Sequence, residues 1–86
     1  MIIGTVKNSV WATRKMDSLN GLKLMVVEIE DNQLTSSSRI IAIDMVGAGS
    51  GERVLVTTGS AARVVFEDSF VPIDAAIVGI IDSIKE

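Results

Sequence analysis

The sequence predicts an all-β protein, a small and partly open five-stranded barrel of the oligonucleotide-fold (OB) type with one short helix. Two observations carry this prediction. β-Branched residues recur in short runs, and clusters of Gly, Asn, Asp and Ser separate these runs at intervals typical of strands. The 86 residues have room for one domain, which we take to be residues 1–86.

The first strand is expected over Ile2 to Lys15. A bulge or bend is expected near Asn8, because glycine and polar residues interrupt the apolar run and such breaks mark corners in barrel strands. The Asn20-Gly21 pair is a strong hairpin signal, since both residues tolerate a positive φ. The second strand then runs from Leu22 to Glu30.

The middle of the chain alternates between polar and apolar segments. Asp31 to Ser38 is expected to be a polar surface loop, followed by a third strand over Arg39 to Val46. A glycine-rich turn, Gly47 to Gly51, leads into a fourth strand over Glu52 to Thr58. The sequence therefore places a tight, glycine-dependent connection between the third and fourth strands.

A short helix and a last strand complete the prediction. Ser60 is expected to cap a helix over Ala61 to Phe66, and the last strand is expected over Ile73 to Ile84. Side chains alternate across a strand, and both faces of this one are apolar, with Val78 and Ile80 on the face opposite the barrel interior. Either the short helix or a neighbouring subunit must cover the outer face. The small size of the helix favours the neighbour.

Composition and charge exclude several classes of function. The net charge is −3, and the chain has one tryptophan and two phenylalanines, which argues against a nucleic-acid partner. No run approaches the roughly 20 apolar residues of a membrane-spanning helix, and no signal-peptide pattern opens the chain. We therefore expect a cytoplasmic protein with no membrane partner. The hydrophobic fraction of 48% exceeds what so small a core hides, so the excess apolar surface is expected to meet a partner subunit or a ligand.

Catalysis would have to depend on carboxylates, because the chain has no histidine and no cysteine. Asp44 and Asp74 lie within apolar strands, where a shifted pKa would be favoured. The favoured interpretation instead places both on the outer barrel face, in solvent or paired with an arginine across an interface. We expect no enzyme, no metal and no cofactor.

The segment G-A-G-S-G-E, residues 47–52, has three interpretations. A phosphate-binding loop is excluded because the glycine spacing differs, no lysine follows, and a strand comes next. A tight turn and a close approach of backbones around a symmetry axis both stay open. If Gly49 has a positive φ, Gly49→Val is expected to strain the turn.

Two segments of the chain are specific in their order and spacing: A-I-D-M-V-G-A-G-S-G-E at residues 42–52 and D-A-A-I-V-G-I-I-D at residues 74–82. With these two segments, the chain from Ile3 to Asp82 resembles the EutN/CcmL family of pentameric vertex proteins from bacterial microcompartments and carboxysomes. Where the family often has two serines before Ala-Arg, this chain has S-A-A-R at residues 60–63.

The resemblance implies a structural protein that forms a cyclic homopentamer. This ring would occupy the vertices of a shell otherwise tiled by hexameric shell proteins and would close the polyhedron, in the bacterial cytoplasm. By the same resemblance, five loop residues lie at the five-fold axis beside a narrow pore: Gly47, Gly49, Ser50, Gly51 and Glu52. The subunit interface is expected to include Arg63, Asp74, Val78 and Ile80.

Two other functions remain as alternatives. A small OB-like barrel could be a binding module for nucleic acid or a peptide, although the acidic charge and the few aromatics count against it. A small enzyme that uses carboxylates is the third hypothesis. The sequence does not choose the compartment type, nor does its physics choose five subunits over six.

Overall fold

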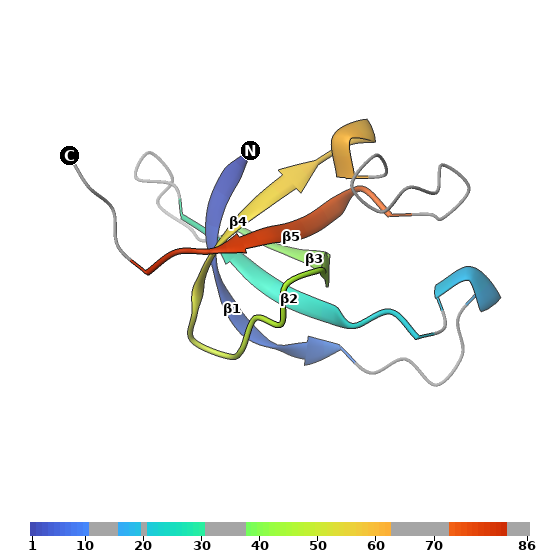
Figure 1. Ribbon diagram of the computed structural model, residues 1–86, viewed down its shortest axis with the longest axis horizontal. Coiled ribbons are helices and arrows are strands. Elements are labelled where there is room, and N and C mark those ends of the chain that lie inside the picture. Colours follow the sequence, from blue (N-terminus) through green and yellow to red (C-terminus); the bar gives the residue numbers. More distant parts are fainter. Residues whose placement is uncertain (11–15, 20, 31–37, 63–72, 83–86) are drawn as a thin grey trace.

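The computed structural model describes residues 1–10, 16–19, 21–30, 38–62 and 73–82. Its five strands close into a barrel in the order β1-β2-β3-β5-β4 (Figure 1), which confirms the all-β barrel. The barrel is closed rather than partly open, because β3 and β5 pair in parallel and complete the ring of strands. The strands are β1 (Ile2–Val10), β2 (Leu24–Ile29), β3 (Ser38–Asp44), β4 (Arg53–Thr58) and β5 (Ala75–Ile80).

The bulge in β1 lies where the sequence predicts it. The pairing of β1 with β2 shifts register between Val6 and Asn8.

Gly4 lies near the start of β1, where the strand approaches β2 closely. A Cβ on Gly4 would overlap Val27 Cγ1 and lie 2.8 Å from the carbonyl oxygen of Glu28. Glycine at this position therefore allows β1 to approach β2. The predicted extension of the strand, residues 11–15, lies outside the described residues.

Several predicted boundaries differ from the structure. β3 ends at Asp44 rather than at Val46, because the Asp44 side chain accepts hydrogen bonds from the next amides and turns the chain. The residues before β2 form a short 3-10 helix, η1 (Asp17–Leu19). Residues 60–62 are helical, so the helix includes Ser60, and the carbonyl oxygen of Gly59 accepts from the amide of Ala62. The helix therefore begins one residue earlier than predicted, and Ser60 lies within it rather than at its N-cap.

The barrel interior holds the main core. Alternate residues of each strand point inward, and β-branched residues supply most of the largest buried side chains. Ala48, from the connection between β3 and β4, is 1% exposed and joins this core. The buried residues of this cluster are Val6, Met25, Val27, Ala42, Ala48, Val54, Val56, Ala75 and Ile77.

A second apolar cluster covers part of the outer face of the barrel. Its buried members are Ile43, Ala62, Ile73 and Ala76, and Val78 packs against it together with three leucines. The chain itself therefore buries the first half of the outer face of β5. Our expectation that a neighbouring subunit covers this face is wrong at Ala76, because Ala62 of the helical segment belongs to the cluster that buries it. No helix in the described part of the chain is long and apolar enough to cross a membrane.

Candidate functional site

The first candidate site is the glycine loop, residues 45–52, which connects β3 to β4. Gly47 and Gly51 have φ angles of 80° and 86°, in the left-handed region that favours glycine. Gly49 does not have a positive φ. The condition under which Gly49→Val was expected to strain the turn is therefore not met. A Cβ at Gly49 would lie 3.2 Å from Glu52 Oε1, which is a close contact with the end of a side chain.

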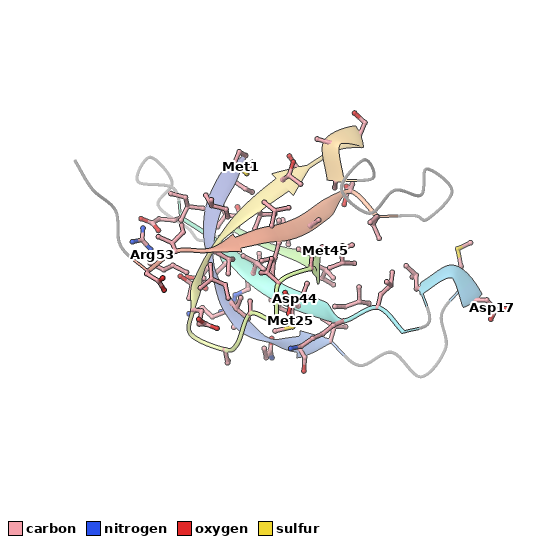
Figure 2. The ribbon with its side chains drawn as sticks, in the orientation of Figure 1. Met1, Asp17, Met25, Asp44, Met45 and Arg53 are labelled. Carbon is pink, nitrogen blue, oxygen red and sulfur yellow. The ribbon has the colours of Figure 1, made fainter. Side chains whose placement is uncertain are left out.

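Asp44 fixes the first half of the glycine loop. Its Oδ1 accepts hydrogen bonds from the amides of Val46 and Gly47, both at 3.0 Å, as in an Asx turn. Its side chain is 1% exposed, and Oδ2 lies 3.6 Å from Lys23 Nζ. Lys23 Nζ also donates to the carbonyl oxygen of Ala48 at 3.4 Å. Figure 2 shows Asp44 at the end of β3, close to Met45.

The surroundings of Asp44 keep it ionised. Burial by itself raises the pKa of this carboxyl, but the amides of Val46, Ala48 and Gly47 and the charge of Lys23 outweigh burial and lower the pKa. The expected placement in solvent or beside an arginine is therefore wrong for Asp44, which is buried and paired with a lysine of the same chain. A carboxylate that is held charged by backbone amides at one oxygen and by a lysine near the other is suited to structure rather than to proton transfer.

The second half of the glycine loop docks on the β1 bulge. Gly51 N donates to the carbonyl oxygen of Val6 at 2.7 Å, and Ser50 Oγ donates to that of Lys7 at 2.5 Å. Gly49 N donates to Glu52 Oε1 at 2.6 Å, while Glu52 N donates back to Gly49 O at 3.2 Å. The amide of Gly49 thus already has an anionic partner, which agrees with the exclusion of a phosphate-binding loop.

The second candidate site is an exposed apolar face. We use this name for four exposed apolar side chains on β3, on β5 and on the connection after β3: Ile41, Met45, Val46 and Ile80, with exposed fractions of 53%, 42%, 41% and 36%. Because Ile43 pairs with Ala76 in the parallel register, Ile41 lies toward the start of β5, whereas Ile80 is its last residue. Ile41 lies two residues before the buried Ile43, so both side chains point outward from β3. Met45 N donates to the carbonyl oxygen of Ile77, which places the start of the glycine loop beside β5.

An apolar groove of about 210 Å³ opens beside Ile41. Asp74 is its one charged lining residue and is exposed, as the sequence predicts. Among the described residues, no group of three or more His, Cys, Asp or Glu is placed to hold a metal ion. The groove is therefore suited to apolar contact. Its lining residues are Leu19, Leu24, Ile41, Ile43, Ile73, Asp74 and Ala75.

A charged face lies on other parts of the barrel exterior. Arg53 Nη2 lies 2.9 and 2.7 Å from the two carboxylate oxygens of Glu30, and Arg39 Nε lies 3.3 Å from Glu28 Oε2. Lys7 Nζ lies 3.8 Å from the same Glu28 oxygen. We define the charged face by Lys7, Glu28, Glu30, Arg39 and Arg53. Because carboxylates pair with all three of its cations, it does not form the basic stripe that nucleic acid requires.

The predicted interface residues differ in their surroundings. Ile80 is exposed, whereas Val78 is half-buried and packs against the second cluster of its own chain. Arg63 lies outside the described residues. The sequence analysis did not single out Ile41, although its alternation with Ile43 was a signal that the outer face of β3 becomes apolar after Arg39. The placement of these residues at a subunit contact stays a prediction.

Comparisons with known proteins agree with this geometry. The family described as "Ethanolamine utilisation protein EutN/carboxysome" matches residues 1–82. The chain is 41% identical to the bacterial microcompartment shell vertex protein GrpN of Rhodospirillum rubrum (strain F11), over 99% of this chain and 97% of that protein. It is 43% identical to the carboxysome shell vertex protein CcmL of Thermosynechococcus vestitus (strain NIES-2133 / IAM M-273 / BP-1), over 99% of this chain and 87% of that one.

A solved structure agrees in three dimensions as well. The GrpN pentameric microcompartment shell protein from Rhodospirillum rubrum superposes with a TM-score of 0.84 and 42% identity, covering all of this chain and 99% of that one. Sequence, fold and both relatives lead to one assignment: the chain belongs to the EutN/CcmL family.

Proposed function

We propose that this protein is a structural, non-enzymatic shell component that forms homopentamers at the vertices of a bacterial microcompartment. The observation that carries the proposal is likeness over the whole chain to proteins named for that position, including one described as pentameric. A vertex ring would contact the hexameric shell proteins around it, within the bacterial cytoplasm. The closed barrel supports a structural role over a catalytic one, as does the ionised Asp44, which binds two loop amides and lies beside Lys23.

The apolar face is the surface that supports self-association. A cyclic ring is built from heterologous contacts, in which one face of a subunit meets a different face of the next. Ile80 is exposed at the end of β5, and exposed apolar groups of this size favour burial against a partner. We place Ile80, Val78, Asp74 and Arg63 at the contact between subunits and add Ile41, which borders the apolar groove.

The glycine loop is the segment that we place near the five-fold axis. Its residues Gly47, Gly49, Ser50 and Gly51 carry no large side chain, which permits several copies to approach one another closely. Its hydrogen bonds to β1 and to Asp44 make it compact before any ring forms. Glu52 would then lie beside the narrow opening at the axis.

The function of such a ring is geometric. Hexameric units tile a flat layer, and a five-membered ring introduces the curvature that closes the layer into a polyhedron. No chemical step is required of the chain, because its contribution lies in the shape and the contacts of the subunit. The relatives include both a carboxysome protein and a protein named only for a microcompartment, so the proposal applies to the vertex of either kind of shell.

Two measurements test this proposal. Native mass spectrometry of the purified chain is expected to give the mass of five subunits, and a monomer or a hexamer would contradict the ring. Co-expression with hexameric shell proteins from the same organism is expected to yield closed polyhedra by electron microscopy. Omitting this chain is expected to leave open vertices or open sheets. Equally closed shells without it would contradict the vertex role.

A further inference from the structure

Two carboxylates stand at the two ends of the glycine loop and bind its amides. Asp44 Oδ1 accepts from the amides of Val46 and Gly47 at 3.0 Å, and Glu52 Oε1 accepts from the amide of Gly49 at 2.6 Å. Backbone amides in glycine-rich turns are the groups with which many proteins bind phosphate and other anions. In this loop, carboxylate oxygens of Asp44 and Glu52 already accept the hydrogen bonds that a bound anion would accept.

Other contacts hold the loop against the barrel. Gly51 N donates to the carbonyl oxygen of Val6, and Ser50 Oγ donates to that of Lys7, so the loop is tied to the β1 bulge. On the opposite side, Lys23 Nζ reaches both the carbonyl oxygen of Ala48 and the carboxylate of Asp44. Since Asp44 is buried, its charge is a fixed part of the loop, whereas Glu52 is exposed and meets solvent.

We infer that Asp44 and Glu52 are positioning residues that fix the glycine loop in one conformation and close its amides to dissolved anions. This is a property of the single chain and goes beyond the vertex role. One consequence does depend on that role. A ring of such loops at the axis would present negatively charged carboxylates, and amides that are already hydrogen-bonded, so it would disfavour anionic solutes at the opening.

Hydrogen exchange of individual amides tests the positioning. Glu52→Ala is expected to raise the exchange rate of the Gly49 amide by at least about tenfold, because a hydrogen bond to a charged acceptor is lost. The Val46 and Gly47 amides, which bind Asp44, are expected to stay protected. Glu52→Gln retains an acceptor oxygen and is expected to retain most of the Gly49 protection. An unchanged Gly49 rate in Glu52→Ala would overturn the inference.

Asp44→Ala provides the reciprocal test. It is expected to accelerate exchange at Val46 and Gly47 by a similar factor and to leave Gly49 protected. Asp44→Asn keeps the acceptor oxygen and serves as the matched control. The core amide of Val27, on β2, reports any general loosening of the barrel. Equal acceleration at Gly49 and at the two amides bound to Asp44, with Val27 unchanged, would contradict separate roles for the two carboxylates.

Inorganic phosphate tests the exclusion of anions, with sodium chloride at the same ionic strength as the control. The Gly49 amide resonance is expected to move with phosphate in Glu52→Ala and to stay in place in the wild-type chain. Equal movement in both proteins, or movement in neither, would show that Glu52 does not keep anions out. Native mass spectrometry of the same samples reports the ring separately, so a failure of the vertex role and a failure of this inference are distinguishable.

Discussion

The charged face and the apolar face occupy the same barrel but differ in how their groups are satisfied. On β3, Arg39 and Ile41 are two residues apart and point outward together. Arg39 meets Glu28 of its own chain, whereas Ile41 remains 53% exposed. Figure 2 shows Arg53 and Met45 well apart on the barrel, whereas Ile80 lies close to Arg53, because it pairs with Val54 and the amide of Ile81 donates to the carbonyl oxygen of Arg53.

The difference indicates which surface needs a partner. Each cation of the charged face already has a carboxylate within the chain, so a partner would add little there. The apolar face gains free energy on burial, at about 25 cal/mol for each Å² removed from water. A ring contact is therefore expected on the apolar face, and substitutions on the two faces should have very different consequences.

The largest effect is expected from Ile80→Glu. A carboxylate introduced into an apolar contact would be buried without a cation, which costs several kcal/mol, roughly enough to abolish a ring. Native mass spectrometry is expected to show monomers while circular dichroism shows an intact barrel. Met16→Glu is the matched control, since Met16 is a 63% exposed apolar residue and is not among the residues that we place at the subunit contact. A ring of native mass in Ile80→Glu would place the interface elsewhere.

The structure also separates two variants that the sequence treats alike. Alternation in the sequence places Val78 and Ile80 together on the outer face of β5, so Val78→Glu and Ile80→Glu are both expected to break assembly. In the structure the register shifts opposite Val78, and the exposed Ile80 pairs with Val54 at the end of the strand. Val78, however, packs against the second cluster of its own chain, so its replacement also disturbs the subunit fold. Ile80→Glu is therefore the cleaner test of the contact between subunits.

The next effect in size is expected at Asp44, beside the apolar face. Asp44→Ala removes a charged acceptor from two amides and leaves Lys23 without its buried partner, at a cost of about 2 kcal/mol in the free energy of unfolding. Urea unfolding at one fixed protein concentration measures this cost, because assembly also contributes to stability. Asp82→Ala, at an exposed aspartate, is the control. Equal midpoints in the two variants would contradict a structural role for Asp44.

The acid dependence of stability gives a further test at the same residue. The folded-state pKa of Asp44 lies below its ordinary value of 3.8, so its contribution is present above that pH and is lost as the pH falls through the folded pKa. Wild-type stability is therefore expected to fall more steeply below about pH 4 than that of Asp44→Asn. Urea titrations across pH 3 to 7 compare the two slopes, and parallel curves would contradict the assignment.

The sequence predicted the parts of this molecule that depend on local pattern. Runs of β-branched residues located the five strands, and the polar interruption near Asn8 located the bulge. The end of β3 was missed because a single side chain, Asp44, ends the strand through its own hydrogen bonds. The closure of the barrel was missed because the parallel pairing of β3 with β5 joins segments far apart in the sequence.

The candidate site was predicted in composition but not in detail. The glycine-rich turn was recognised, yet residue type alone does not reveal that Gly47 and Gly51, and not Gly49, take a positive φ. Alternation showed that both faces of β5 are apolar, but it does not reveal which residues the chain covers by itself. That division, with Ala76 buried and Ile80 exposed, arises from tertiary packing of Ala62 and the leucines near η1.

The smallest effect is expected on the charged face. Glu30→Gln breaks the bidentate pair with Arg53, but both side chains are partly exposed, so the loss is expected to be at most about 1 kcal/mol. Salt is expected to reduce even this difference, because dissolved ions screen exposed charges. Urea unfolding at low and high salt measures the change, and native mass spectrometry is expected to show an intact ring. Loss of the ring in Glu30→Gln, with the barrel still folded, would transfer the subunit contact from the apolar face to the charged one.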